Sequence, residues 1–242
     1  MRNVFLIGAM KCGTNTLYKA LAKHAHVATP KKKELDYFLE PHNRKPYADL
    51  FEIGPDTRVC LDGTTQYSKY PGFKHIPQTL FDFNPDSRII YMMRDPVERL
   101  ESNVAHAIAR KENITVDDWR GSGKLGNMLS YSRYFTQIAP YIQLFGQSRV
   151  FLGIFEEFIN DQPAFIERVC DFLDLDKGRL EIEEVHANPR RKDAGADSLS
   201  FSRDDDRRFA RELKVDIDCL ERHLGIDASR WWKRYQEALS HE

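Results

Sequence analysis

The chain has 242 residues, of which 41% are hydrophobic and 30% charged, and its formal net charge is −1. This length suits one domain with a substantial core, so we expect a single domain over residues 1–242. The near-zero charge argues against a protein that binds nucleic acid or a membrane surface through its overall charge. No apolar run has transmembrane length and the N-terminus does not resemble a signal peptide, which together predict a cytoplasmic protein.

The first predicted elements are a strand, a turn and a helix. The apolar run at residues 4–7 predicts a buried strand that ends at Gly8, and a turn of small residues continues to Gly13. Residues 15–23 are suited to a helix. Free backbone N–H groups and the positive end of the helix dipole converge at such a junction, which therefore predicts an anion site.

The loop between the two glycines departs from the Walker form G-x-x-x-x-G-K-S/T. Thr14 and Asn15 stand where that form has its lysine and hydroxyl, and the lysine lies inside the loop as Lys11. A kinase needs the Walker lysine on the β- and γ-phosphates and the hydroxyl on magnesium. The loop is therefore suited to a phosphate but not to a metal-bound triphosphate.

The pattern K-x-G-T-x-T-L, which begins at Lys11, resembles the 5′-phosphosulfate loop of sulfotransferases. These enzymes use 3′-phosphoadenosine 5′-phosphosulfate (PAPS) as sulfuryl donor. The resemblance implies that the donor is bound by Lys11, Cys12, Gly13, Thr14, Asn15 and Thr16.

Pro30 is expected to prevent a helix, and three lysines and Glu34 follow it. A solvated loop explains Lys31 and Lys32, whereas the apolar residues at 35, 37 and 38 should draw Glu34 against the core. The segment resembles the K-E-x-x-F-F stretch of carbohydrate sulfotransferases, which implies that Glu34 is the general base.

Residues 59–61 predict a second buried strand with a polar exit. If the sheet is parallel, the exit residues Asp62, Thr64 and Tyr67 should lie near the ligand, which binds at the carboxyl ends of strands. The sulfotransferases often have a lysine after the acidic residue, and here Gly63 occupies that place. Any contact of that lysine must be absent or come from another residue.

Residues 88–93 predict a third buried strand, and Asp95 is suited to cap the helix that follows. The pattern R-D-P-x-x-R-x-x-S resembles the 3′-phosphate site of the same enzymes, which implies that Arg94 and Ser102 bind the donor. His106 lies one turn after Ser102. In heparan-type enzymes a histidine at this position faces the acceptor, and the resemblance implies the same for His106. The alternative is that His106 is an ordinary surface residue.

The remaining elements follow from apolar spacing and turn residues. A basic loop with Arg190, Arg191 and Lys192 resembles the segment that closes on the donor in sulfotransferases, although a solvated surface loop is the alternative. Residues 231 and 232, both tryptophan, should pack back on the body. We expect helices over 73–83, 96–111, 163–173 and 202–224, a loop over 112–127, helical spacing over 129–145 interrupted by Pro140, and a strand over 149–155.

Taken together, the resemblance implies an α/β protein with a central parallel sheet flanked by helices, in a P-loop-like sulfotransferase fold. It implies metal-independent in-line transfer from PAPS, with the product 3′-phosphoadenosine 5′-phosphate (PAP), to a hydroxyl or amine of a saccharide, glycolipid or small metabolite. Lys11 would offset charge on the leaving phosphate, and Glu34 would be the base, with His106 as the alternative.

Two other functions fit part of the sequence. A nucleotide-dependent kinase with a degenerate P-loop could use Asp62 at a strand end, but its lysine would be misplaced. A non-catalytic polyanion-binding module could use residues 31–33 and 190–192 as a basic surface. The acceptor and the oligomeric state stay open.

Overall fold

The computed structural model describes residues 1–39, 45–109, 123–177 and 201–231. The predicted donor residues Arg190, Arg191 and Lys192 lie outside these ranges. The chain divides into two compact units, Met1–Met93 with Ile138–Pro189 and Arg94–Gln137 with Arg190–Glu242. The single domain over 1–242 stays a prediction.

The first unit contains a sheet of five parallel strands in the order β2-β3-β1-β4-β5. This confirms the predicted α/β class with a central parallel sheet. Four strands were expected, and the fifth, β2, was missed because its two residues are too short to form an apolar run. The strands are β1 (Arg2–Gly8), β2 (Val27–Ala28), β3 (Val59–Asp62), β4 (Arg88–Met93) and β5 (Val150–Ile154).

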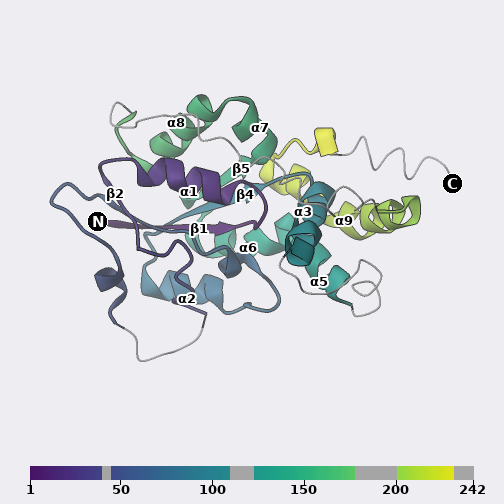
Figure 1. Cartoon of the computed structure of the whole chain (residues 1–242), viewed down its shortest axis with the longest axis horizontal. Helices are drawn as coiled ribbons and strands as arrows, with labels where there is room; N and C mark the ends of the chain where they lie inside the picture. The colour runs from purple at the N-terminus through teal and green to yellow at the C-terminus, as the bar shows by residue number, and fades with distance from the viewer. Residues whose placement is uncertain (40–44, 110–122, 178–200, 232–242) are drawn as a thin grey trace. The chain divides into compact units, whose positions relative to one another are not determined.

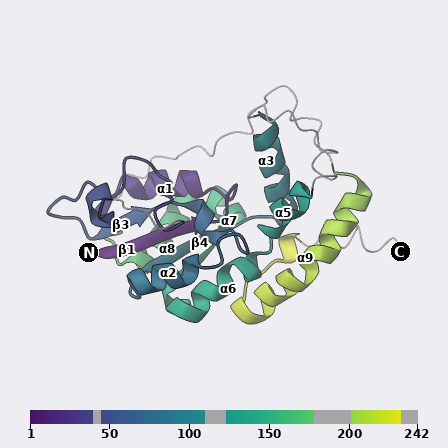
Figure 2. The same ribbon diagram turned by 90° about the horizontal axis from the view of Figure 1, so that it is seen from below.

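Helices cover both faces of this sheet, so its central strands are apolar and buried between their polar end residues, as parallel strands usually are. α1 and α8 lie on one face, and α2 and the last part of α6 lie on the other (Figures 1 and 2). Ring contacts fix both layers, with Phe151 of β5 5.7 Å from Phe165 of α8, and Phe81 of α2 5.4 Å from Phe145 of α6. The helices are α1 (Thr14–Ala22), α2 (Ile76–Phe83), α6 (Tyr134–Phe145), α7 (Phe155–Asn160) and α8 (Gln162–Leu173), with 3-10 turns η1 (Tyr47–Leu50), η2 (Thr65–Ser68) and η3 (Gln147–Arg149).

The described part of the second unit is helical, with α3 (Pro96–Ala109), α5 (Lys124–Ser130), the start of α6 and α9 (Arg203–Leu224). Ser202 and Asp205 form a capping box at the start of α9, as the capped helix predicted from sequence requires. Trp231 is buried, with its ring 5.9 Å from that of Tyr134, which confirms the prediction that it packs back on the body.

Four details of the helices differ from the prediction. Residues 124–127 belong to α5 rather than to a loop, and Phe155, which was expected to end a strand, begins α7. Pro140 lies inside α6 without ending it. The helix expected over 129–145 is divided before Tyr134 because Asp216 of α9 accepts hydrogen bonds from the amides of Phe135 and Thr136, both at 2.9 Å, and so starts a new helix.

Candidate functional site

The loop between β1 and α1 begins at the carboxyl end of a central strand, where ligands of open parallel sheets bind. Two hydrogen bonds hold this exit in place. The amide of Ala9 donates to the carbonyl of Met92 on β4 at 2.7 Å, and the hydroxyl of Ser68 donates to the carbonyl of Ile7 at 2.7 Å. The first residues of the loop are therefore fixed by both neighbouring chain segments of the first unit.

Gly13 ends the loop and is the N-cap of α1. Its φ of 79° lies in the left-handed region, and a Cβ there would stand 2.7 Å from the ring of Phe155, so only glycine fits. The first turn of α1 carries no acidic residue, and Gly13 has no side chain that could accept from its amides. These N–H groups, together with the positive end of the helix dipole, can therefore serve an anion.

The side chains of the loop and the first turn of α1 divide into two groups. Thr14 and Thr16 are buried hydroxyls, and Cys12 is completely buried, so any contact of Cys12 with a donor would come from its backbone. Asn15 is exposed, and Lys11 is half-buried with a φ of 70°. A lysine in the left-handed region is uncommon, and such residues concentrate at functional sites.

Residues 33–38, which we call the strap, lie against the exit of β3. The hydroxyl of Thr64 accepts hydrogen bonds from the amides of Leu35 at 3.0 Å and Asp36 at 3.3 Å. Phe38 packs edge-on against Phe5 of β1, with ring centroids 5.9 Å apart. The apolar residues thus hold the strap on the core, which is what the sequence pattern predicted for the segment that contains Glu34.

Asp62, at the end of β3, anchors this arrangement. Its carboxylate is fully buried and accepts from the hydroxyl of Thr64 at 2.7 Å and from those of Tyr67 and Tyr47 at 3.2 and 3.3 Å. Burial raises the pKa of Asp62 to about 6, and these hydrogen bonds oppose that rise. Asp62 is therefore a structural group under the strap, whereas the sequence suggested a place near the ligand.

The strap also joins Glu34 to the loop between β1 and α1 (residues 9–13), which we call the anion loop. Glu34 is half-buried and accepts a hydrogen bond from the hydroxyl of Thr65 at 3.1 Å. Its neighbour Lys33 donates from Nζ to the hydroxyl of Thr14, in the first turn of α1, at 3.4 Å. The proposed base and the proposed phosphate loop therefore belong to one hydrogen-bonded arrangement within the first unit.

The remaining predicted site residues belong to the second unit. Asp95 caps α3 as expected, because its carboxylate accepts from the amides of Val97 and Glu98 at 2.9 and 3.0 Å. Arg94 forms an ion pair with Glu98, one helical turn away. Ser102 is half-buried.

His106 follows Ser102 by one turn of α3 and is exposed. Lys11 and Glu34 belong to the first unit, and Arg94, Ser102 and His106 to the second. That one nucleotide contacts residues of both units stays a prediction.

Arg99, the second arginine of the R-D-P-x-x-R pattern, has a structural role. It is completely buried, and its guanidinium donates to the hydroxyl of Ser132 and to the carbonyl of Met128, both at 2.6 Å. Ser132 in turn donates to the carbonyl of Pro96 at 2.8 Å. Arg99 therefore joins α3 to α5.

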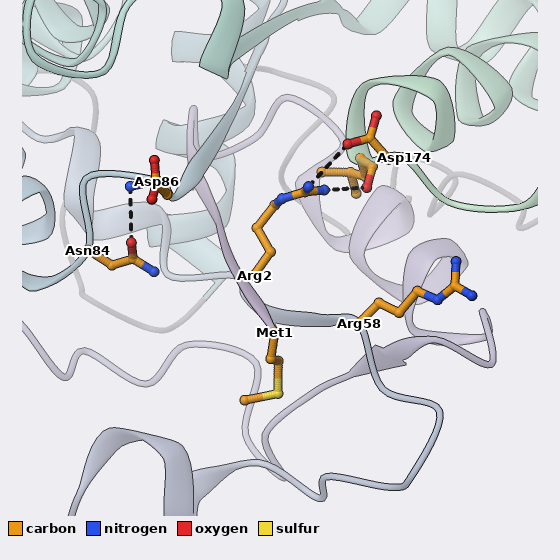
Figure 3. Close-up of a pocket in the computed structure, with 7 residues that line it drawn as sticks. Met1, Arg2, Arg58, Asn84, Asp86 and Asp174 are labelled. Atoms are coloured by element: carbon orange, nitrogen blue, oxygen red, sulfur yellow. Dashed lines mark hydrogen bonds and ion pairs between the residues drawn. The ribbon is translucent and has the colours of Figure 1, made fainter.

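A pocket of about 400 Å³ lies at the amino ends of the strands, opposite the end from which the anion loop begins (Figure 3). Arg2, at the start of β1, and Arg58, just before β3, line it together with Asp174, which pairs with Arg2 at 3.1 Å. The loop after β1 lies at the carboxyl ends of the strands, so this pocket is separate from it.

A metal centre and a membrane-spanning helix are both absent from the part of the chain that the structure describes. In those residues, no group of three or more histidine, cysteine, aspartate or glutamate side chains is arranged to hold a metal ion. Every helix among them is also too short or too polar to span a bilayer.

Comparison with known proteins gives three related findings. A crystal structure of a sulfotransferase from Alicyclobacillus acidocaldarius matches with a TM-score of 0.78 and 24% identity, over 96% of this chain and 98% of that one. This confirms the predicted fold. Mouse heparan sulfate glucosamine 3-O-sulfotransferase 3A1 is 23% identical over 182 residues, which are 70% of this chain and 45% of the relative.

Human heparan sulfate glucosamine 3-O-sulfotransferase 6 is 23% identical over 180 residues, which are 70% of this chain and 51% of the relative. The chain thus spans about half the length of these curated relatives. The family model described as "Sulfotransferase domain" matches residues 1–193, and these include the anion loop, the strap and the start of α3. This chain therefore belongs to the sulfotransferase domain family.

Proposed function

We propose that the chain is a PAPS-dependent sulfotransferase that acts on a hydroxyl or amine of a saccharide, glycolipid or small metabolite. The observation that carries this proposal is the junction of loop and strap. Lys33 donates to Thr14 of the loop, and the next residue is Glu34, the carboxylate proposed as base. This contact supports the proposal that the loop binds phosphate and that the strap provides the proton acceptor.

The residues of the loop fit the donor. Its amides lie at the start of α1, Lys11 provides an ammonium group, and Thr14 and Thr16 provide hydroxyls, while the first turn contains no carboxylate. This donor set suits a phosphate or phosphosulfate dianion. When bound, PAPS would supply the sulfuryl group.

Each residue then has a role in the transfer. Lys11 offsets the negative charge that develops on the leaving phosphate oxygen as its bond to sulfur breaks and the acceptor oxygen bonds to sulfur. Glu34 accepts the proton that the acceptor hydroxyl loses, and the bond from Thr65 orients its carboxylate. His106 is the alternative base. PAP is the second product.

Other residues would recognise the nucleotide. Arg94 and Ser102 would hold the 3′-phosphate and so favour PAPS over ATP, with Arg190, Arg191 and Lys192 closing over it. The names of the curated relatives refer to heparan sulfate glucosamine, which among the possible acceptors favours a saccharide.

The two other functions receive less support. A kinase would need Asp62 at the metal, but this carboxylate is buried beneath Thr64, Tyr67 and Tyr47. A polyanion-binding surface would need residues 31–33 on one face, but Lys31 and Lys32 are exposed while Lys33 contacts Thr14.

Calorimetry with PAP and with ATP tests the proposal. We expect binding of PAP, much weaker binding of ATP, and transfer of label from PAPS to at least one saccharide in an acceptor screen that contains EDTA. A preference for ATP would support the kinase. Binding of neither nucleotide would support the polyanion-binding module, and activity lost in EDTA and restored by magnesium would contradict the metal-independent mechanism.

A further inference from the structure

The three consecutive lysines of the strap region have different environments. Lys31 and Lys32 are exposed, and Lys31 lies 3.9 Å from Glu52 in an exposed ion pair. Lys33 is half-buried, and burial lowers the pKa of its ammonium group. The sequence gives all three the same charge, so the difference arises from where the chain places Lys33.

Contacts along its whole length direct Lys33 toward the anion loop. The amide of Gly63 donates to the carbonyl of Lys33 at 3.3 Å, and the side chain continues past the Tyr18 ring, with Nζ 5.8 Å from the centroid. Nζ then donates to the hydroxyl of Thr14 at 3.4 Å. Lys33 therefore ends at the first residue of α1, where the loop amides converge.

Gly63 leaves the space that this path requires. A Cβ at position 63 would stand 2.9 Å from Cγ and Cε of Lys33 and 2.7 Å from the Tyr18 ring. Carbon atoms do not approach so closely without movement, so any side chain at position 63 would displace the stem of Lys33. The absence of a side chain at Gly63 and the position of Lys33 thus belong to one packing arrangement.

The charge of Lys33 still requires compensation. Among the described residues, Lys33 forms no ion pair, and its hydrogen bond goes to a neutral hydroxyl. Burial lowers the pKa of Lys33 more than the adjacent Glu34 carboxylate raises it, so Glu34 compensates the charge only in part. A partly desolvated ammonium group has three N–H donors, and placing it without an anion is unfavourable. A bound dianion at the start of α1 would supply that missing charge.

We propose that Lys33 is a second lysine of the donor site, whose Nζ donates to the 5′-phosphate group held by the loop at α1. This inference rests on the proposed function and assigns a binding role to a residue that the sequence motifs left as part of a basic run. Lys11, inside the loop, and Lys33, from the strap, would then share the negative charge of one phosphate.

The test compares Lys33→Met with Lys32→Met by calorimetry, with PAP and adenosine 3′-phosphate as probes. Methionine keeps an unbranched stem against Gly63 and removes the charge, while Lys32→Met removes the same charge from an exposed neighbour. We expect Lys33→Met to weaken PAP binding by about 10- to 100-fold, as for loss of a hydrogen bond to a charged group. Binding of adenosine 3′-phosphate, which lacks the 5′-phosphate, should change little.

Two further variants keep the test decisive if Lys33→Met is poorly folded. Gly63→Ala leaves the lysine in place but pushes its stem, and it should weaken PAP binding in the same direction by a smaller factor. Lys33→Arg keeps the charge and should retain more PAP affinity than Lys33→Met. Equal loss for both probes, or equal loss in Lys32→Met, would overturn the role of Lys33.

The result also separates this inference from the proposed function. If the wild-type protein fails to bind PAP, both proposals are wrong. If the wild type binds PAP, Lys11→Ala loses binding and Lys33→Met binds as the wild type does, only the assignment of Lys33 is wrong.

Discussion

The loop–strap junction of the first unit and the start of α3 in the second unit each contain a cation, but the two cations have different neighbours. Lys33 meets the neutral hydroxyl of Thr14 at 3.4 Å, whereas Arg94 forms an ion pair with the carboxylate of Glu98. Among the described residues Lys33 forms no ion pair, although the adjacent Glu34 carboxylate attracts it, whereas Arg94 has an ion-pair partner in α3. Whether a charged side chain is available to a ligand therefore depends on its neighbours and not only on the sign of its charge.

This difference has a consequence for binding. An anion at the loop would meet Lys33 without displacing an ion-pair partner of that lysine among the described residues. An anion at Arg94 must compete with Glu98 for the guanidinium, so part of its attraction is offset. We therefore expect the loop to provide most of the affinity and Arg94 to contribute mainly selectivity for a 3′-phosphate.

Lys11→Ala should have the largest effect. It removes the ammonium group that offsets charge on the leaving phosphate, and we expect the single-turnover rate with labelled PAPS to fall by about 1,000-fold. Lys32→Ala, an equal loss of charge at an exposed position, should leave the rate unchanged. A Lys11→Ala protein with more than a tenth of the wild-type rate would show that the loop does not carry the chemistry.

Glu34→Gln tests the strap as the source of the base. The amide oxygen can still accept from Thr65, so the strap should keep its position while the proton acceptor is lost. We expect a rate about 100-fold lower, with PAP affinity unchanged by calorimetry. A nearly wild-type rate would make His106 of α3 the favoured base. The base would then come from the second unit and not from the strap.

Asp62→Asn tests the anchor of the strap through pH. The pKa of Asp62 is raised from 3.8 to about 6, so the native state binds this proton more tightly than the unfolded state. This tighter proton binding stabilises the native state. Its contribution to the free energy of unfolding is fully present below pH 3.8 and is lost as the pH rises through about 6. The shift corresponds to about 3 kcal/mol.

Urea unfolding of both proteins between pH 3.5 and about pH 7.5 measures this contribution. As the pH rises, the unfolding free energy of the wild type should fall relative to that of Asp62→Asn. A difference that stays constant over this range would mean that Asp62 titrates normally and is not the buried anchor described here.

Glu98→Gln should have the smallest effect and sharpens the comparison most directly. It removes the counter-charge of Arg94, and we expect PAP binding to tighten by about 3- to 10-fold. Glu101→Gln removes the same charge from α3 and should change PAP affinity less. If Glu98→Gln weakens PAP binding instead, Glu98 positions Arg94 rather than competing for it.

Much of the fold follows from local sequence patterns. Apolar runs bounded by charge and glycine identified β1, β3, β4 and β5, because parallel strands buried on both faces are almost uniformly apolar. β2 was missed, since two residues carry no pattern and the pairing of Val27 and Ala28 with β3 defines the strand. The break before α6 depends on Asp216, about 80 residues away, which no local pattern reveals.

For the candidate site, the sequence by itself determined the strand–loop–helix junction from which the chemistry of the loop is proposed, because the spacing of Gly8, Lys11 and Gly13 and the start of a helix are local features. It also indicated that Gly63 lacks a side chain where related enzymes often have a lysine. Only the tertiary structure decided that Lys33 fills that space, that Asp62 supports the strap and that Glu98 pairs with Arg94. These outcomes depend on burial and on neighbours brought together by folding, and a charge read from sequence does not contain that information.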